Sequence, residues 1–174
     1  MSQIVLTTLN ARYWHSAFGL RYLMANLGPL RKDTTMLEFG ISENTVDILA
    51  AVLEYEPRIV GIGIYIWNIE PTTRLVADLK RVRPDVTVIL GGPEVSYETE
   101  DQRIVELADF VITGEADLVF RSLCESLLES KTTEDGIQPQ RPSLPVSSNS
   151  SEVISKIIAA PLPQFEQLAL PYDL

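Results

Sequence analysis

The run Ile59–Tyr65 constrains the fold of this chain more than any other feature of the sequence. It reads Ile-Val-Gly-Ile-Gly-Ile-Tyr and holds no charged residue at either of its two alternating sets of positions. A strand made from it has two apolar faces, and both must be covered. Such strands lie inside parallel sheets that carry helices on both sides. We therefore expect a central parallel strand in an α/β domain.

Four other short apolar runs fit the same arrangement, and a helical segment separates each run from the next. Five alternations predict an α/β fold with an open, doubly wound, five-stranded parallel sheet and helices on both faces. We expect the flavodoxin-like strand order 2-1-3-4-5, which places the topological switch between the first and third strands. The expected strands are Ile4–Leu9, Thr34–Phe39, Ile59–Tyr65, Val86–Leu90 and Phe110–Thr113.

Local signals predict where helices begin and where they pack closely. Ser16 and Ser42 precede apolar residues at helical spacing and are expected N-caps. Asn68 is the natural N-cap of the helix after the central strand. Gly61-x-Gly63 lies inside that strand, which favours close packing of a helix against it.

The composition changes near residue 130 and predicts two parts. Residues 1–130 hold the strand and helix pattern. Residues 131–174 begin with a stretch rich in Ser, Thr, Pro and Gln, which favours a flexible segment. Within them, residues 152–158 could add an edge strand. The prolines that follow are typical of a linker toward a domain that is absent from this chain.

Charge and cysteine content exclude several classes of protein. The formal net charge of −10 argues against nucleic-acid and anionic-membrane partners, since both need basic surface. Cys124 is the only cysteine, so no internal disulfide forms, and one cysteine with one histidine cannot complete a structural zinc site. No apolar run approaches the roughly 20 residues of a membrane helix, and no signal peptide is recognised. We expect a cytoplasmic protein.

Ligands of open α/β sheets bind outside the carboxyl ends of the strands, near the topological switch. Four loops are expected there: Asn10–Ser16, Tyr65–Glu70, Gly91–Ser96 and Thr113–Asp117. The candidate cofactor-binding residues come from these loops. They are Asn10, Arg12, Tyr13, His15, Ser16, Tyr65, Trp67, Asn68, Gly91, Gly92, Pro93, Glu94, Thr113, Gly114 and Glu115.

Each loop has a structural and a ligand-binding interpretation. The aromatic residues before His15 could pack under the sheet edge or line a large planar ligand. Asn68 could cap a helix, and Glu115 could face a helix dipole or accept from a ligand amide. Gly91-Gly92 could form a tight turn only. We favour ligand contact for this pair, because two glycines at a strand end let a ligand approach the backbone.

The sequence contains no recognisable catalytic set. It has no Gly-x-Ser-x-Gly elbow for a nucleophilic serine and no Gly-Lys-Ser/Thr phosphate loop. The first expected strand is followed by Asn10 and the third by Trp67-Asn68, so the aspartates of a phosphoacceptor receiver domain are missing.

Several segments together resemble one known family. Their sequences are Asn-Ala-Arg-Tyr-Trp-His-Ser at 10–16, Gly-Leu-Arg-Tyr-Leu at 19–23, Pro-Arg-Ile-Val-Gly-Ile-Gly-Ile-Tyr-Ile-Trp-Asn at 57–68, Leu-Gly-Gly-Pro at 90–93 and Asp-Phe-Val-Ile-Thr-Gly-Glu-Ala-Asp at 109–117. Over roughly residues 1–130 the chain resembles the N-terminal cobalamin-binding domain of the cobalamin-dependent radical SAM enzymes. The ending Leu170-Pro-Tyr-Asp is similar to the linker before their barrel domain.

The resemblance implies a cofactor and a partner domain. In this family the corrin lies at the carboxyl end of the sheet, and its nucleotide tail enters beside the glycine pair. The chemistry belongs to a C-terminal radical SAM domain whose Cys-x-x-x-Cys-x-x-Cys motif holds a 4Fe-4S cluster that cleaves S-adenosylmethionine. With Cys124 alone, this chain cannot hold that cluster. We expect it to be non-catalytic by itself and to serve methyl transfer or related radical chemistry on an unknown substrate.

The resemblance makes His15 a weak candidate for cobalt ligation. Many cobalamin domains carry Asp-x-His-x-x-Gly after the first strand, and the aspartate orients the histidine that binds cobalt. Here Tyr13 and Phe18 occupy the aspartate and glycine positions, and Gly19 comes one residue late. The carboxylate that supports such a histidine is therefore missing.

Two other function classes remain open from the sequence. The chain could bind a flavin or another nucleotide at the same switch point, as flavodoxin-like domains do. It could also be a ligand-free domain that docks a partner domain.

Overall fold

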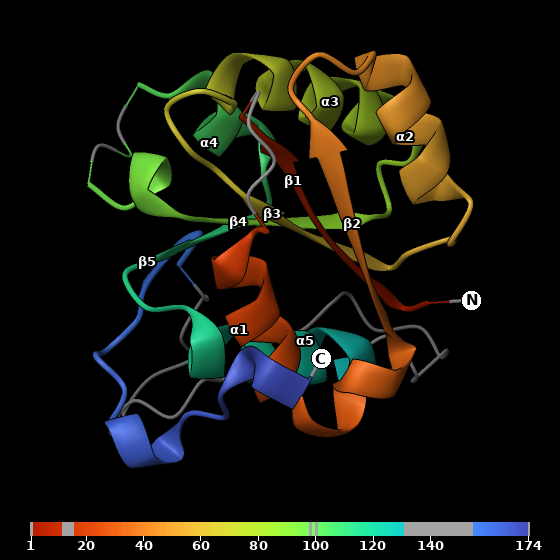
Figure 1. Ribbon diagram of the computed structural model, residues 1–174. Helices are drawn as coiled ribbons and strands as arrows, with labels where there is room; N and C mark the ends of the chain where they lie inside the picture. The colour runs from red at the N-terminus through yellow and green to blue at the C-terminus, as the bar shows by residue number, and fades with distance from the viewer. Residues whose placement is uncertain (1, 12–15, 98, 100, 131–154, 174) are drawn as a thin grey trace.

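The computed structural model describes residues 2–11, 16–97, 99, 101–130 and 155–173. Within them, the strands form one open parallel sheet in the order β2-β1-β3-β4-β5-β6. Figure 1 shows α2, α3 and α4 on one face of the sheet and α1 and α5 on the other. The strands are β1 (Ile4–Asn10), β2 (Thr34–Gly40), β3 (Ile59–Gly63), β4 (Thr87–Gly91), β5 (Phe110–Thr113) and β6 (Ile157–Ala159); the helices are α1 (Phe18–Asn26), α2 (Thr45–Leu53), α3 (Ile69–Val82), α4 (Arg103–Leu107) and α5 (Asp117–Ser130).

The expected strand order 2-1-3-4-5 is confirmed, and β6 extends the sheet beyond β5. An edge strand was expected at residues 152–158; the structure has one at Ile157–Ala159, so it begins and ends later than expected. β3 lies between β1 and β4, and its residues Ile59, Val60 and Ile62 are at most 3% exposed. The two apolar faces of the central run therefore each meet a layer of helices.

Alternate residues of β3 enter two separate cores. Val60 and Ile62 point to the side of α2, α3 and α4, where they join a large apolar cluster. Ile59 points to the other side, where α1 and α5 pack, and Phe120 and Leu123 belong to that second cluster.

Helix starts differ from the expected capping residues. The side chain of Asn44, rather than Ser42, caps α2 by accepting from the Val46 N–H at 3.0 Å. The N-cap residue of α1 is Ala17 rather than Ser16, and no side chain caps this helix. The Ala17 N–H instead donates to the carboxylate of Glu38, on β2, at 2.8 Å.

Residues 155–173, which we call the C-terminal strap, lie against the α1–α5 side of the domain (Figure 1). The strap begins with β6 and continues through two short 3-10 helices, Phe165–Gln167 and Pro171–Asp173. The side chain of Asn26, at the end of α1, accepts from the Ala169 N–H at 2.8 Å and donates to the Ala169 carbonyl at 3.1 Å. Among the described residues, no helix has the length and apolar character needed to cross a membrane.

Candidate functional site

A cavity of about 640 Å³ lies on the face of the sheet that α1 and α5 cover. β3, β4 and β5 form its floor, α1 and the beginning of α5 form its walls, and the C-terminal strap closes the remaining side. This volume lies within the range of roughly 300–1,000 Å³ that is usual for cofactor pockets. The inner part is apolar and is lined by Leu20, Leu23, Ile89, Ile112 and Phe120.

Three glycines remove side chains from the floor of the cavity. A β-carbon at Gly61 would lie 2.8 Å from the Phe120 ring, so the missing side chain lets α5 pack onto β3. At Gly63 and Gly91 the nearest atoms to such a carbon are 3.5 and 3.7 Å away, which is ordinary contact. The expected close helix packing is thus confirmed for Gly61 and does not hold for Gly63. Both glycines line the cavity, and at Gly91 only the carbonyl oxygen of Ile112 would meet a β-carbon, so a ligand can approach its backbone.

Gly92 serves a different purpose from its neighbour. Its φ of 111° is rare for other residues, and a β-carbon there would lie 2.4 Å from the carbonyl oxygen of Ile64. The Ile64 N–H donates to the Gly91 carbonyl at 2.8 Å. The turn interpretation therefore applies to Gly92, which brings the ends of β3 and β4 together, while both glycines also line the cavity.

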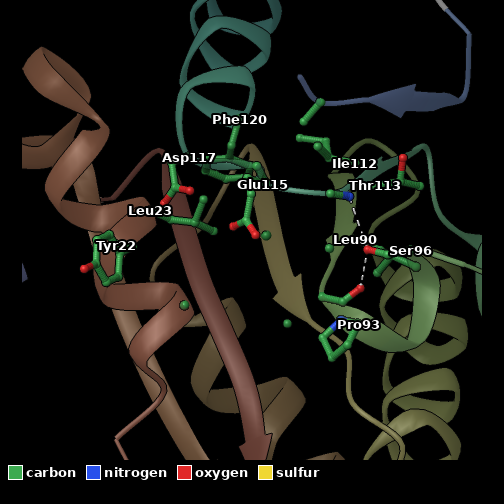
Figure 2. A pocket seen from close by; sticks show the side chains of 18 of the residues that line it. Tyr22, Leu23, Leu90, Pro93, Ser96, Ile112, Thr113, Glu115, Asp117 and Phe120 are labelled. Atoms are coloured by element: carbon green, nitrogen blue, oxygen red, sulfur yellow. Dashed lines mark hydrogen bonds between the residues drawn. The ribbon is translucent and has the colours of Figure 1, made fainter. Parts of the chain in front are cut away.

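Ser96 holds the rim of the cavity together. Its hydroxyl donates to the Gly92 carbonyl at 2.8 Å and accepts from the Gly114 N–H at 3.3 Å, as the dashed lines in Figure 2 show. These two bonds join the loop after β4 to the loop after β5. A rim built in this way loses little freedom when a ligand binds, which favours affinity.

Two carboxyl groups, from Glu115 and Asp117, lie at the mouth (Figure 2). Asp117 is only 8% exposed, and this burial raises the pKa of its carboxyl above the ordinary value. A hydrogen bond from its own backbone opposes the shift, and the charge of Glu115 adds to it. The cavity lining contains no Lys, Arg or His among the residues described. The mouth thus suits neutral or hydrogen-bond-donating groups better than a doubly charged phosphate.

Tyr65 and Trp67 follow β3 and stack on each other, with ring centroids 4.7 Å apart and planes 4° from parallel. The Tyr65 hydroxyl would lie 3.5 Å from a β-carbon at Gly19, so this ring reaches from β3 toward α1 at the edge of the cavity. Burial raises the pKa of the Tyr65 hydroxyl. Trp67 is not part of the cavity lining, and its Nε1–H donates to the Leu9 carbonyl at 3.2 Å.

The side chain of Asn68 is fully buried and bonds to backbone groups and the Thr8 hydroxyl rather than to the cavity. Its Oδ1 accepts from the Tyr65 N–H at 2.8 Å, and its Nδ2 donates to the carbonyls of Leu9 and Gly63, each at 3.1 Å. Asn68 is the N-cap residue of α3, but its side chain makes no capping bond to that helix. It instead holds the turn after β3 against the end of β1.

Asn10 also uses its amide for structure. Its Nδ2 donates to Glu38 at 2.8 Å, and the same carboxylate accepts from the Ala17 N–H and from Arg21. Both ends of the loop between β1 and α1 are therefore tied to one carboxylate on β2. The carboxylate was not singled out from the sequence, because its strand position indicates only a partly exposed face.

The structure brings about half of the expected site residues to the cavity. Those that line it are Tyr65, Gly91, Gly92, Pro93, Thr113, Gly114 and Glu115. Asn10, Ser16, Trp67, Asn68 and Glu94 are described but lie outside the lining. Arg12, Tyr13 and His15 lie outside the described residues.

Sequence reasoning missed the lining residues from α1, from α5 and from the strap. Leu20, Leu23 and Phe120 have the spacing of ordinary core residues, and Ala160, Phe165 and Leu168 stand among prolines that indicate a linker. No group of three or more His, Cys, Asp or Glu side chains in the described part of the chain could hold a metal ion.

Comparisons with known proteins find similarity in sequence and in fold. A relative from Pyrococcus horikoshii, named as an uncharacterized methyltransferase, is 25% identical over 164 residues; these cover 87% of this chain and 34% of the relative. The chain therefore spans about a third of the curated relative it matches. A crystal structure of a cobalamin-binding protein from Desulfitobacterium hafniense superposes with a TM-score of 0.52 at 27% identity, covering 72% of this chain and 58% of that one.

The family match covers the whole five-stranded unit. The B12 binding domain family matches residues 4–124, from the start of β1 into α5. This range includes the floor of the cavity, both of its helical walls and the glycine pair. The chain belongs to the B12-binding domain family.

Proposed function

We propose that this chain binds cobalamin and that the cavity holds the nucleotide tail of the cofactor. The observation that carries the proposal is the apolar cavity beside Gly91 and Gly92, open to the carboxyl end of the sheet. In this arrangement, Leu20, Leu23 and Phe120 would contact the base of the tail. Gly91 would let the tail pass close to the backbone, since a β-carbon there would meet only the carbonyl oxygen of Ile112, at 3.7 Å.

The charge of the cavity favours cobalamin over flavin mononucleotide. The phosphate of a flavin mononucleotide is a dianion and needs several donors or a basic residue. The described lining offers carboxyl groups from Glu115 and Asp117 and no basic side chain. The phosphodiester of cobalamin carries one negative charge, and the rest of the tail is neutral. The cavity therefore fits the cobalamin tail better than it fits a flavin phosphate.

Cobalamin, when bound, supplies cobalt-centred chemistry such as the carriage of a methyl group. The residues described here would bind and orient the cofactor and exclude water from its tail. We further propose that the chain serves a larger enzyme, in which a C-terminal radical SAM domain with a 4Fe-4S cluster and S-adenosylmethionine acts on the substrate. Support comes from the sequence resemblance and from a methyltransferase-named relative about three times as long.

We also propose that cobalt is not held by a carboxylate-supported histidine. Tyr13 stands where the supporting aspartate would be, so His15 lacks that partner in sequence. The electron paramagnetic resonance spectrum of the Co(II) form should show no protein nitrogen coupling. Nitrogen coupling that disappears in His15→Ala would contradict this proposal.

Addition of hydroxocobalamin to the purified chain tests the main proposal. The corrin absorbance should stay with the protein on gel filtration. At about a hundred times the dissociation constant, the ligand should stabilise the fold by roughly 2.7 kcal/mol, which raises the melting temperature. Gly91→Leu fills the floor of the cavity and should abolish binding. Ile66→Ala is the matched control, because Ile66 is 75% exposed and does not line the cavity.

Flavin mononucleotide provides the competing arm of the experiment. Stabilisation by flavin mononucleotide without stabilisation by hydroxocobalamin would overturn the proposal in favour of a flavodoxin-like module. Stabilisation by neither would support a domain that only docks a partner. Binding of hydroxocobalamin that survives Gly91→Leu would show that the tail binds elsewhere.

A further inference from the structure

The C-terminal strap supplies one side of the cavity, although it follows the five-stranded unit and lies outside the matched range 4–124. Three of its residues, Ala160, Phe165 and Leu168, line the cavity. They come from a different segment than α1, β5 and the other lining elements. The strap is therefore part of the site rather than only a connection away from it.

Phe165 is unusual among these lining residues. It is 74% exposed, although it stands at the edge of a cavity whose inner surface is apolar. A large aromatic side chain in this position leaves apolar area in water, which is unfavourable. A ligand that fills the cavity would cover part of the ring, and this contact would contribute to its affinity.

The strap is held in place by contacts at both ends. At its start, β6 pairs with β5, and the Ala160 N–H donates to the Thr113 carbonyl at 2.9 Å. Toward its end, the backbone of Ala169 exchanges two hydrogen bonds with the side chain of Asn26 of α1. The Tyr172 ring lies 6.5 Å from that of Phe18. Phe165 and Leu168 fall between these anchors, over the cavity.

The sequence of the strap also limits its freedom. Pro161, Pro163 and Pro171 fix three backbone φ angles. Gln164 and Gln167 form a capping box around the 3-10 helix that begins at Phe165. A segment ordered in this way loses less entropy when it closes on a ligand than a flexible tail of equal length would.

We propose that the strap binds the nucleotide tail of the cofactor directly, through Phe165 and Leu168, and that bound cofactor in turn holds the strap on the domain. This inference rests on the proposed function, because its ligand is cobalamin. The coupling is reciprocal: if the docked strap raises the equilibrium affinity for the ligand, the ligand must stabilise the docked strap by the same free energy.

Dissociation of hydroxocobalamin from single-site variants tests the first half of the proposal. Phe165→Ala should speed dissociation about tenfold, the loss of one good aromatic contact. Leu162→Ala is the matched control, because Leu162 lies in the same strap, is 85% exposed and does not line the cavity. It should leave the rate unchanged within about twofold.

A second kind of variant weakens the attachment of the strap to α1 and leaves every lining residue in place. It tests whether the strap must stay docked, apart from the contact that Phe165 makes. Ala169→Pro removes the N–H that donates to Asn26 and alters no residue of α1 or of the cavity lining. It should also speed dissociation several-fold. Asn26→Ala breaks the same link from the other side and should act alike, provided that its far-ultraviolet circular dichroism matches that of the parent chain.

Hydrogen exchange tests the second half without relying on affinity. The amides of Ala160 and Ala169 should exchange more slowly after hydroxocobalamin is added, while the amides of α3, on the opposite face, should not change. If the parent chain fails to bind hydroxocobalamin, the proposed function fails and this inference fails with it. If it binds, but the three variants release it at the parental rate and the strap amides are unaffected, only this inference is overturned.

Discussion

The backbone of Gly92 lies so close to that of Ile64 that a β-carbon at position 92 would be 2.4 Å from the Ile64 carbonyl oxygen. The φ of 111° at Gly92 adds a second reason for glycine at this turn. Gly91, one residue earlier, has neither restriction, because its β-carbon would meet nothing closer than 3.7 Å. A side chain at position 92 would therefore destabilise the fold much more than a side chain at position 91.

Alanine substitutions should separate these two roles. Gly92→Ala should lower the free energy of unfolding by about 3 kcal/mol or more, because it combines a strained φ with a backbone clash. Gly91→Ala should change stability by less than about 1 kcal/mol but place a methyl group in the cavity, and so weaken hydroxocobalamin binding. Urea denaturation and absorbance titration measure the two effects. A Gly92→Ala variant as stable as the parent would contradict the close approach to Ile64.

The buried amide of Asn68 should be important for stability rather than for ligand contact. Asn68→Ala leaves the Tyr65 N–H without its acceptor and should cost about 2–4 kcal/mol. Asn68→Asp should be no better, since a carboxylate cannot donate to the oxygens of Leu9 and Gly63 and would be buried in charged form. Asn44→Ala is the matched control at an exposed helix cap and should cost only about 1 kcal/mol.

Chemical denaturation of the three asparagine variants provides the comparison. The midpoints should fall in the order parent, Asn44→Ala, Asn68→Ala, with Asn68→Asp at or below the last. If Asn44→Ala and Asn68→Ala lowered the free energy of unfolding equally, the buried hydrogen bonds of Asn68 would contribute little to stability.

The central strands and their order were accessible from the sequence because they depend on local patterns. Ile59–Tyr65 is apolar on both faces, and that pattern leaves few positions in a sheet other than the middle. The ends of helices were less accessible. Ser42 and Asn44 are both good capping residues two positions apart, and only the path of the backbone decides between them.

The candidate site was predictable where it depends on strand ends and not where it depends on distant partners. Gly91 and Gly92 could be placed at the site because a glycine pair directly follows a buried strand. The local sequence indicates a helix cap at Asn68, whereas one partner of its side chain, the Leu9 carbonyl, lies 59 residues earlier. The prolines around Phe165 and Leu168 indicate a linker, and nothing in that local pattern signals the cavity that these residues line.

Cys124 should be unreactive in the folded protein. The thiol is fully buried on α5, and burial raises its pKa far above the usual value, with the charge of Glu125 adding to the shift. Since the thiolate is the nucleophile, an aromatic disulfide reagent at pH 8 should label the native chain only as fast as it unfolds. The same reagent in guanidinium chloride should release one equivalent of chromophore. Rapid labelling of the native chain would show that α5 opens locally.

Asp117 should make stability depend on pH in the direction opposite to that of a salt-bridged carboxylate. Its pKa in the folded chain lies above the ordinary value of 3.8, because the carboxyl is buried at the cavity mouth. The folded state therefore binds this proton more tightly than the unfolded state does. Below pH 3.8 the carboxyl is protonated in both the folded and the unfolded chain, so it does not lower the free energy of unfolding. As the pH rises through the folded pKa, the buried group must ionise and stability is lost.

Asp117→Asn removes this titration and nearly preserves the shape of the side chain. The difference in free energy of unfolding between Asp117→Asn and the parent should therefore shift in favour of the variant as the pH rises from below 3.8 through the folded pKa, and then stay constant. Asp78→Asn is the control, because Asp78 lies on the exposed side of α3, where it pairs with Arg81. Urea denaturation across this pH range measures both differences. A difference for Asp117→Asn that stays flat with pH would show that the carboxyl at the mouth is solvated as well in the folded chain as in the unfolded one.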